Sequence, residues 1–234
     1  MANEAQQEAD RVRAAYARRA QLGLDDRYAY WEPANLIIFQ SRERALLSAL
    51  RAASMLPLTG RRVLDAGCGD GSVLRDLLRY GAEASDLHGI DLLEDRVARA
   101  RELTPGAHIE AGDVQQLPYE VESFDLVLEF TLLSSVTDAA ARQRVASELL
   151  RVTKPGGLVL VYDFWLNPLN RDVKALRRDD LRVLFPGRAI EFRGTTLAPP
   201  LTRLLLKAPG GWLAATLLEV IPFLRTHYVA AIRS

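Results

Sequence analysis

The sequence predicts an α/β fold built on a doubly wound, mostly parallel sheet. Short apolar runs that end in an acidic residue, at 63–65, 87–91 and 124–129, alternate with segments whose apolar residues have helical spacing. This alternation is typical of the strand–helix–strand units that form a parallel sheet. The chain has 234 residues, of which 49% are hydrophobic, so it is long enough to bury a sizeable core.

The most informative segment is 63–71, an apolar run followed by glycine at every second position. Gly67, Gly69 and Gly71 can adopt positive φ angles and let the backbone approach a ligand closely, because they carry no Cβ. The next residues, 72–78, have helical spacing, so the free N–H groups of a helix N-terminus would point back at the turn. The segment is therefore predicted to be a nucleotide-binding turn.

The acidic residues of this turn narrow the choice of nucleotide. A dinucleotide fingerprint has the spacing G-x-G-x-x-G, but here the third glycine, Gly71, comes one residue early. The phosphate-binding pattern G-x-x-x-x-G-K-[ST] is absent from the turn. Asp65 and Asp70 would repel a pyrophosphate and suit a ligand that carries an amine or hydroxyl groups.

A second predicted strand, 87–91, ends in Asp91. At roughly this distance from a glycine turn, the acid at the tip of the second strand binds the ribose hydroxyls of a nucleotide. Asp91 could instead cap the helix predicted at 94–100. We expect the ribose role because the turn precedes it.

Three further segments follow in a characteristic order. Gly112-Asp113 follows a strand at 107–111, a fourth strand spans 123–130, and Pro155-Gly156-Gly157 stands between a helix and a fifth strand. Together with the turn, this pattern closely resembles the class I S-adenosylmethionine-dependent methyltransferases over 61–163. The resemblance implies a Rossmann-like sheet of seven strands, with strand 7 antiparallel beside strand 5, and S-adenosylmethionine as the cofactor.

The resemblance also implies which residues meet the cofactor. Asp113 and Val114 would contact the adenine, and the ring of Phe130 could face the sulfonium, since a cation is attracted to an aromatic face. Cys68 is the only cysteine, so no intrachain disulfide can form, and we expect it chiefly to pack inside the turn. The predicted cofactor-binding residues are Asp65, Gly67, Cys68, Gly69, Gly71, Asp91, Leu92, Asp113, Val114, Glu129 and Phe130.

Three residues are candidates for catalysis: His227, Asp163 and Glu129. A predicted last strand, 226–233, begins at the same sheet edge if it runs antiparallel as in the family. His227 could then take a proton from a hydroxyl acceptor, with Asp163 or Glu129 serving as the base or orienting the imidazole. Alternatively, His227 is a hydrogen-bonded strand-end residue, and the enzyme acts by aligning acceptor and methyl group.

Two helical stretches precede the first strand, at 3–22 and 34–56. In small-molecule methyltransferases such helices fold over the cofactor, so we predict an N-terminal helical cap at 1–57 and a methyltransferase domain at 58–234. The aromatic break between the helices would line the site or simply pin the chain to the core. Acceptor-site insertions are expected at 164–186 and 197–224, and the predicted substrate-binding residues are Tyr28, Tyr30, Trp31, Trp165 and Asn167.

The acceptor is expected to be a small molecule, a sugar or a natural product, methylated on a hydroxyl or, less readily, on an amine. The formal net charge is zero and the chain has no long run of like charges, which argues against a nucleic-acid substrate. The segment 129–135 also lacks the Asn/Asp-Pro-Pro-aromatic motif of base-amine methyltransferases. Two alternatives stay open: a non-catalytic cofactor-binding or assembly protein, and an NAD-dependent oxidoreductase of the same fold.

Other features complete these expectations. The segment 199–223 is apolar and helical in pattern, and is expected either to cover the sheet or to touch a membrane surface. The N-terminus is charged and lacks an apolar signal core, so a cytoplasmic location is expected. Three scattered histidines and a single cysteine do not suggest a metal site. The sequence leaves the acceptor's identity and the oligomeric state open.

Overall fold

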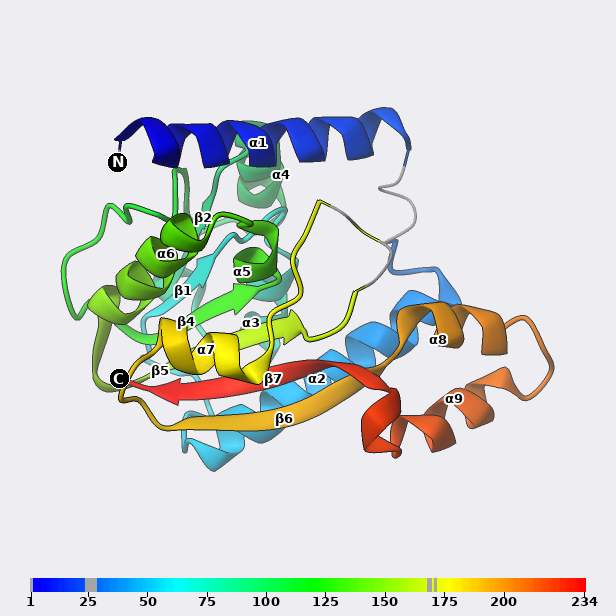
Figure 1. Cartoon of the computed structure of the whole chain (residues 1–234). Coiled ribbons are helices and arrows are strands. Elements are labelled where there is room, and N and C mark those ends of the chain that lie inside the picture. Colours follow the sequence, from blue (N-terminus) through cyan, green and yellow to red (C-terminus); the bar gives the residue numbers. More distant parts are fainter. Residues whose placement is uncertain (1, 24–28, 168–169, 171) are drawn as a thin grey trace.

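A computed structural model describes residues 2–23, 29–167, 170 and 172–234 (Figure 1). Within these residues a seven-stranded sheet has the strand order β3-β2-β1-β4-β5-β7-β6. β1 to β5 are mutually parallel where they pair, and β7 runs antiparallel to both β5 and β6. The predicted mostly parallel sheet with an antiparallel seventh strand is thus confirmed. The strands are β1 Val63–Ala66, β2 Leu87–Asp91, β3 His108–Ala111, β4 Phe124–Phe130, β5 Thr153–Phe164, β6 Ile190–Leu197 and β7 Arg225–Arg233.

Helices cover both faces of the sheet, as expected for a doubly wound fold. α2, α3 and α4 pack on one face, and α5, α6 and α7 pack on the other. The helices are α1 Ala2–Gln21, α2 Pro33–Ala52, α3 Ser72–Arg79, α4 Glu94–Leu103, α5 Leu132–Ser135, α6 Ala139–Val152, α7 Arg178–Leu184, α8 Pro199–Leu205 and α9 Gly211–Glu219, with short 3₁₀ turns at η2 Ala84–Asp86 and η3 Pro222–Leu224.

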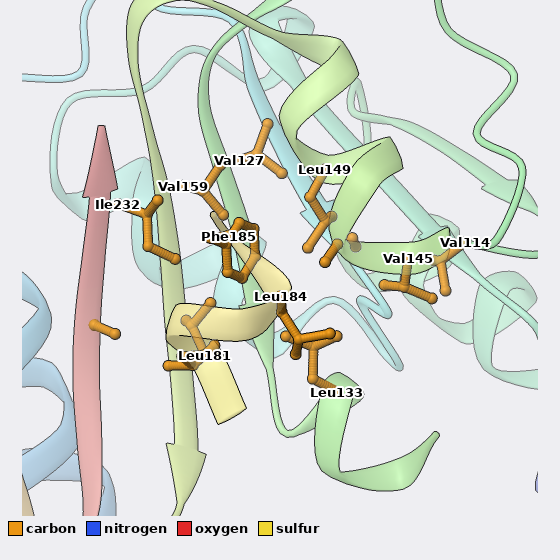
Figure 2. Close-up of a cluster of buried hydrophobic side chains, with 14 of the residues drawn as sticks. Val114, Val127, Leu133, Val145, Leu149, Val159, Leu181, Leu184, Phe185 and Ile232 are labelled. Carbon is orange, nitrogen blue, oxygen red and sulfur yellow. The ribbon is translucent and has the colours of Figure 1, made fainter. Parts of the chain in front are cut away.

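Figure 2 shows the core between the sheet and the second helix layer. Val127 and Val159 project from β4 and β5 toward Leu149 of α6, and Phe185 fills the space beside them. These four side chains are at most 1% exposed. Full burial of an aliphatic or aromatic side chain of this kind contributes about 1.5–3 kcal/mol, so this layer stabilises the packing of α6 on β4 and β5.

The fifth strand begins earlier than the sequence suggests. β5 starts at Thr153, directly after α6, and runs through Pro155-Gly156-Gly157 instead of following it. The register with β4 shifts between Phe124 and Leu126, so this part of the strand is irregular. A Cβ at Gly157 would lie 2.8 Å from the Lys154 carbonyl oxygen, which explains the need for glycine here. The Pro-Gly-Gly motif therefore marks an irregular strand start.

The two N-terminal helices have different positions. α2 is a layer of the fold, because Leu46, Ala49 and Leu50 are buried against the sheet. α1 instead lies across the molecule beside α4, α5 and α6 (Figure 1). The predicted cap at 1–57 thus divides into a core helix and an outer helix, since the apolar stripe of α2 is needed to cover the strands. No helix of the described residues is both long and apolar enough to cross a bilayer.

Candidate cofactor and acceptor site

The glycine turn connects β1 to α3 at the carboxyl edge of the sheet. Gly67 and Gly69 have φ angles of 77° and 54°, in the left-handed region that favours glycine. A Cβ on Gly67 would lie 3.2 Å from Leu132 Cδ1, so α5 packs directly on the turn. At Gly69 the nearest atom would be Arg96 Nη1 at 3.8 Å, which leaves room beside the backbone. The turn is therefore closed on the α5 side and accessible at Gly69.

Asp65 is the last residue but one of β1, just before this turn, and is 1% exposed. Neither of its carboxylate oxygens has a hydrogen-bond partner among the residues that the structure describes. The pKa of Asp65 is raised to about 7, chiefly by burial; the Arg42 guanidinium opposes this shift, and the nearby Asp91 and Asp70 carboxylates add to it. A buried carboxylate without donors is costly, and a cationic or hydrogen-donating group beside it would lower that cost.

Asp91 organises the turn from the neighbouring strand. Its Oδ2 accepts a hydrogen bond from the Gly69 N–H at 2.9 Å, and its Oδ1 accepts one from the Leu93 N–H at the same distance. Leu92, the next residue, is half-buried. Each carboxylate oxygen can accept a second hydrogen bond, so Asp91 keeps acceptor capacity for a ligand.

Asp113 lies in the segment after β3. Its two carboxylate oxygens accept from the Gln115 N–H at 2.9 Å and from Gln115 Nε2 at 3.0 Å. The same Nε2 donates to the Ala5 carbonyl oxygen of α1, so α1 is attached to this segment. Val114 is buried in the core beside α6. Its side chain is therefore committed to packing.

Arg42 is a charged group of the site that sequence reasoning missed. Its guanidinium lies 5.1 Å from the centre of the Phe39 ring, 5.3 Å from that of Phe130 and 6.0 Å from that of Tyr162. Its Nη2 is 3.6 Å from Asp76 Oδ2. No local motif marks Arg42, because its position depends on how α2 packs beside β4 and β5.

Glu129 and Asp163 are the last residues but one of β4 and β5, face the α6 side of the sheet and are both completely buried. Glu129 Oε2 accepts from the Leu132 and Leu133 N–H groups, and Asp163 Oδ2 accepts from the Ser134 N–H at 3.0 Å. Burial and the neighbouring Asp163 raise the pKa of Glu129 well above its usual range, and burial raises that of Asp163 to about 7. The pair therefore holds α5 in place.

His227 lies at the start of β7 and faces the opposite helix layer. Its ring stacks on Tyr162 with centroids 5.3 Å apart, and its Nδ1 is 3.0 Å from Thr226 Oγ1. Burial lowers the pKa of His227 to about 4, so the imidazole is neutral near pH 7. The backbone of β7 does run beside that of Asp163, as expected from the topology.

The prediction that Asp163 or Glu129 orients the imidazole of His227 is wrong. His227 is paired across the strands with Phe164, and Asp163 is paired with Tyr228. Successive side chains of a strand point to opposite faces, so Asp163 faces α6 while His227 faces the α2 layer. Glu129 is on the Asp163 side for the same reason. Neither carboxylate can orient the imidazole, and the sheet itself separates them.

α1 lies over the carboxyl edge and is held by charged contacts. Glu8 accepts from the Thr137 N–H at 2.6 Å, and Arg11, which pairs with Glu8 at 2.8 Å, donates to the Asp172 carbonyl oxygen at 3.3 Å. The Tyr16 ring lies 4.3 Å from the guanidinium of Arg96, the residue nearest to the open side of Gly69. Arg96, with the Tyr16 ring packed on it, is thus a further neighbour of the turn that the sequence pattern did not indicate.

The predicted substrate-binding residues are dispersed. Tyr30 stacks on Phe39 at 5.5 Å and so reaches the surroundings of Arg42, whereas Trp31 is 78% exposed. Trp165 Nε1 donates to the Arg225 carbonyl oxygen at 2.9 Å, and Asn167 Oδ1 accepts from the Asn170 N–H at 3.1 Å. Tyr28 lies outside the described residues. In the described ranges no group of three or more His, Cys, Asp or Glu side chains could hold a metal ion.

Known proteins resemble this chain in both sequence and fold. A family model described as a methyltransferase domain matches residues 63–157. The 27-O-demethylrifamycin SV methyltransferase of Amycolatopsis mediterranei is 33% identical over 70% of this chain and 58% of its own length. The demethylmenaquinone methyltransferase of Beutenbergia cavernae is 37% identical over 53% of this chain and 48% of its own length. The chain spans about half the length of these curated relatives.

A solved structure extends the likeness to most of the chain. Magnesium protoporphyrin IX methyltransferase from Synechocystis PCC 6803, with bound S-adenosylmethionine, has a TM-score of 0.64 and 17% sequence identity. The match covers 96% of this chain and 97% of that protein. At this identity the likeness shows a shared fold.

Proposed function

We propose that the chain is a class I S-adenosylmethionine-dependent methyltransferase that transfers a methyl group from S-adenosylmethionine to a hydroxyl of a small molecule. The observation that carries this proposal is the buried carboxylate of Asp65, whose oxygens have no partner among the described residues, beside a glycine turn that is accessible at Gly69. A ligand with an ammonium group would satisfy this carboxylate.

The side chains around the glycine turn suit each of the functional groups of S-adenosylmethionine. Asp65 would accept from its ammonium group, and the Arg42 guanidinium would suit its carboxylate. Asp91 has acceptor capacity for ribose hydroxyls, and Asp113 for the adenine amine. The aromatic ring of Phe130 would lie favourably near a positive charge.

When bound, S-adenosylmethionine supplies a methyl group already activated by its sulfonium centre. The protein then has to hold the acceptor in line with that group and exclude water, and alignment alone can lower the barrier considerably. His227 is neutral near pH 7 and can accept a hydroxyl proton, whereas Asp163 and Glu129 position α5. We therefore assign His227 as the candidate base and the two carboxylates as positioning residues.

The named relatives support a small-molecule acceptor. One is named for a demethylrifamycin and the other for demethylmenaquinone, both small organic molecules, and the first name specifies an oxygen position. A hydroxyl acceptor needs to lose a proton during transfer, which gives a base such as His227 a function. An amine acceptor remains the second choice within the same mechanism.

Calorimetric titration of S-adenosylhomocysteine into the full chain tests the cofactor assignment, with NADH as the control ligand. We expect binding of S-adenosylhomocysteine, none of NADH, and a loss of about 2–3 kcal/mol in Asp91→Ala, which is typical of lost charged hydrogen bonds. Absence of binding to a folded protein would overturn the proposal. Binding without turnover on any hydroxyl or amine acceptor would favour the non-catalytic alternative instead.

A further inference from the structure

The α8–α9 hairpin, residues 199–223, is apolar on two sides. Its inner side chains join a small core in which Ala215 packs with Ile37 of α2 and Leu197 of β6. Its outer side is also apolar. Leu213, Leu217 and Phe223 are 65%, 61% and 77% exposed, and Leu204, Trp212 and Val220 are exposed as well. The predicted cover over the sheet therefore accounts for only the inner side.

An ordinary surface helix carries charged side chains on the face that meets water. α9 has a single charged residue, Glu219, and this residue is turned inward. Its carboxylate accepts from Ser41 Oγ and pairs with Arg44 at 2.7 Å. The solvent side of α9 is left with Trp212, Leu217 and similar residues. Exposed apolar patches of this kind mark interaction sites.

The charges around the hairpin favour an anionic partner. In the segment 199–225, Glu219 is the only acidic residue, whereas Arg203, Lys207 and Arg225 are basic. Lys207 is exposed in the connection between the two helices. Because Glu219 is already neutralised by Arg44, the hairpin presents net positive charge beside its apolar side chains. This combination is typical of segments that lie on anionic lipid.

The tryptophans support the same partner. All three tryptophans of the chain are exposed, by 78% for Trp31, 37% for Trp165 and 44% for Trp212. Trp165 is bonded to the Arg225 carbonyl oxygen at the end of the hairpin. Trp31 precedes α2, whose first turns lie beside α8 (Figure 1). Tryptophan prefers the boundary between lipid and water, because its ring is apolar and its N–H is polar.

We propose that the α8–α9 hairpin docks the protein on the surface of an anionic lipid bilayer. Leu213, Leu217 and Phe223 would enter the interface, and Lys207 would meet the lipid head groups. The contact is interfacial and does not require a spanning helix. It does not depend on methyl transfer, so it can hold or fail separately from the proposed function.

The test is co-sedimentation of the full chain with vesicles of phosphatidylcholine alone or mixed with phosphatidylglycerol. We expect binding to the anionic vesicles that weakens in high salt, because surface charges are then screened. The double substitution Leu217→Ser/Phe223→Ser should lower the partition coefficient about tenfold or more, since it removes two large apolar side chains that would enter the interface. Lys207→Glu should weaken binding to the anionic vesicles selectively.

Matched controls separate docking from folding. Val183→Ser removes a side chain that is 71% exposed on α7, and Arg188→Glu makes the same charge change as Lys207→Glu. Both should bind vesicles like the unchanged chain. Binding of S-adenosylhomocysteine and the melting temperature should be the same for all variants.

Three results would overturn the proposal: no vesicle binding, equal binding to neutral and anionic vesicles, or unchanged binding of the hairpin variants. Sedimentation velocity tests the alternative that a second copy of the chain covers the apolar patch. If the chain dimerises, the hairpin substitutions abolish the dimer, and vesicles are not bound, the patch joins two copies of the chain.

Discussion

His227 and Asp163 lie on adjacent strands, yet their side chains leave opposite faces of the sheet. His227 is paired with Phe164 and stacks on Tyr162, whereas Asp163 is paired with Tyr228 and bonds to the backbone of α5. Two groups that the family topology brings to one edge are thus kept apart by the period of two along each strand. Each has its own set of contacts, and substitutions should separate their effects.

Asp163→Ala should destabilise the protein, whereas His227→Ala should mainly slow turnover. The first removes a buried carboxylate that accepts from Ser134 and lies near Arg142, so we expect a loss of about 2–3 kcal/mol in unfolding free energy. Chemical denaturation measures this loss. In the double variant the two stability effects should add, because the two side chains project from opposite faces of the sheet. Clear non-additivity would show that they are coupled through the sheet.

Asp65→Asn should change how stability depends on pH. The pKa of Asp65 is raised by burial from 3.8 to about 7 in the folded chain. Between these values the unfolded chain has lost a proton that the folded chain keeps, so this group makes stability fall as pH rises toward 7. The melting temperature of the variant relative to the unchanged chain should therefore increase over this range and level off above it. A constant difference would contradict the assigned ionisation.

The affinity for S-adenosylhomocysteine should also depend on the ionisation of Asp65. It should rise with pH over the range in which this group lowers stability. If the ionised Asp65 carboxylate binds the ligand's ammonium, affinity should rise by up to about tenfold per pH unit below pH 7 and become constant above it. Calorimetry at several pH values measures this dependence. Asp65→Asn should bind more weakly and with a flatter profile. If the affinity of the variant rises as steeply with pH, the ionisation that controls binding belongs to another group.

The pH–rate profile should show no ionisation of His227 near the ordinary pKa of histidine. Burial lowers the pKa of His227 to about 4, so the imidazole stays neutral and able to accept a proton well below pH 6.5. We expect the profile of kcat to contain no inflection from this residue between about pH 5.5 and 8. An NMR titration of the ring protons of His227 measures its pKa directly. A value near 6.5 would contradict the buried position.

Gly67→Ala should lower stability more than Gly156→Ala. Both glycines have a similar positive φ, 77° and 74°, so both substitutions cost roughly 1–2 kcal/mol for the left-handed conformation. Only at Gly67 would the new methyl group also approach Leu132, at 3.2 Å, whereas no atom lies within 4 Å at Gly156. Thermal unfolding compares the two. In a Leu132→Ala background, the difference in stability loss between the two glycine variants should shrink. If it persists, a contact other than that with Leu132 causes the extra loss at Gly67.

The sequence by itself determined the features that depend on neighbouring residues. The glycine turn at 67–71 follows from the need for positive φ angles, and the strands and helices follow from apolar periodicity. The motif order over 61–163 also gave the antiparallel last strand, through the resemblance to a family with that topology. These features leave a local pattern, so they could be predicted.

The tertiary structure decided which side chains meet. Arg42 reaches Phe130 only because α2 packs on the sheet, and His227 turns from Asp163 because of the register between β5 and β7. The outer side of α9 is apolar in sequence, but its exposure follows from the inner side being taken by Ile37 and Leu197. Contacts between distant segments leave no local pattern, since each residue's surroundings are set by packing and strand register.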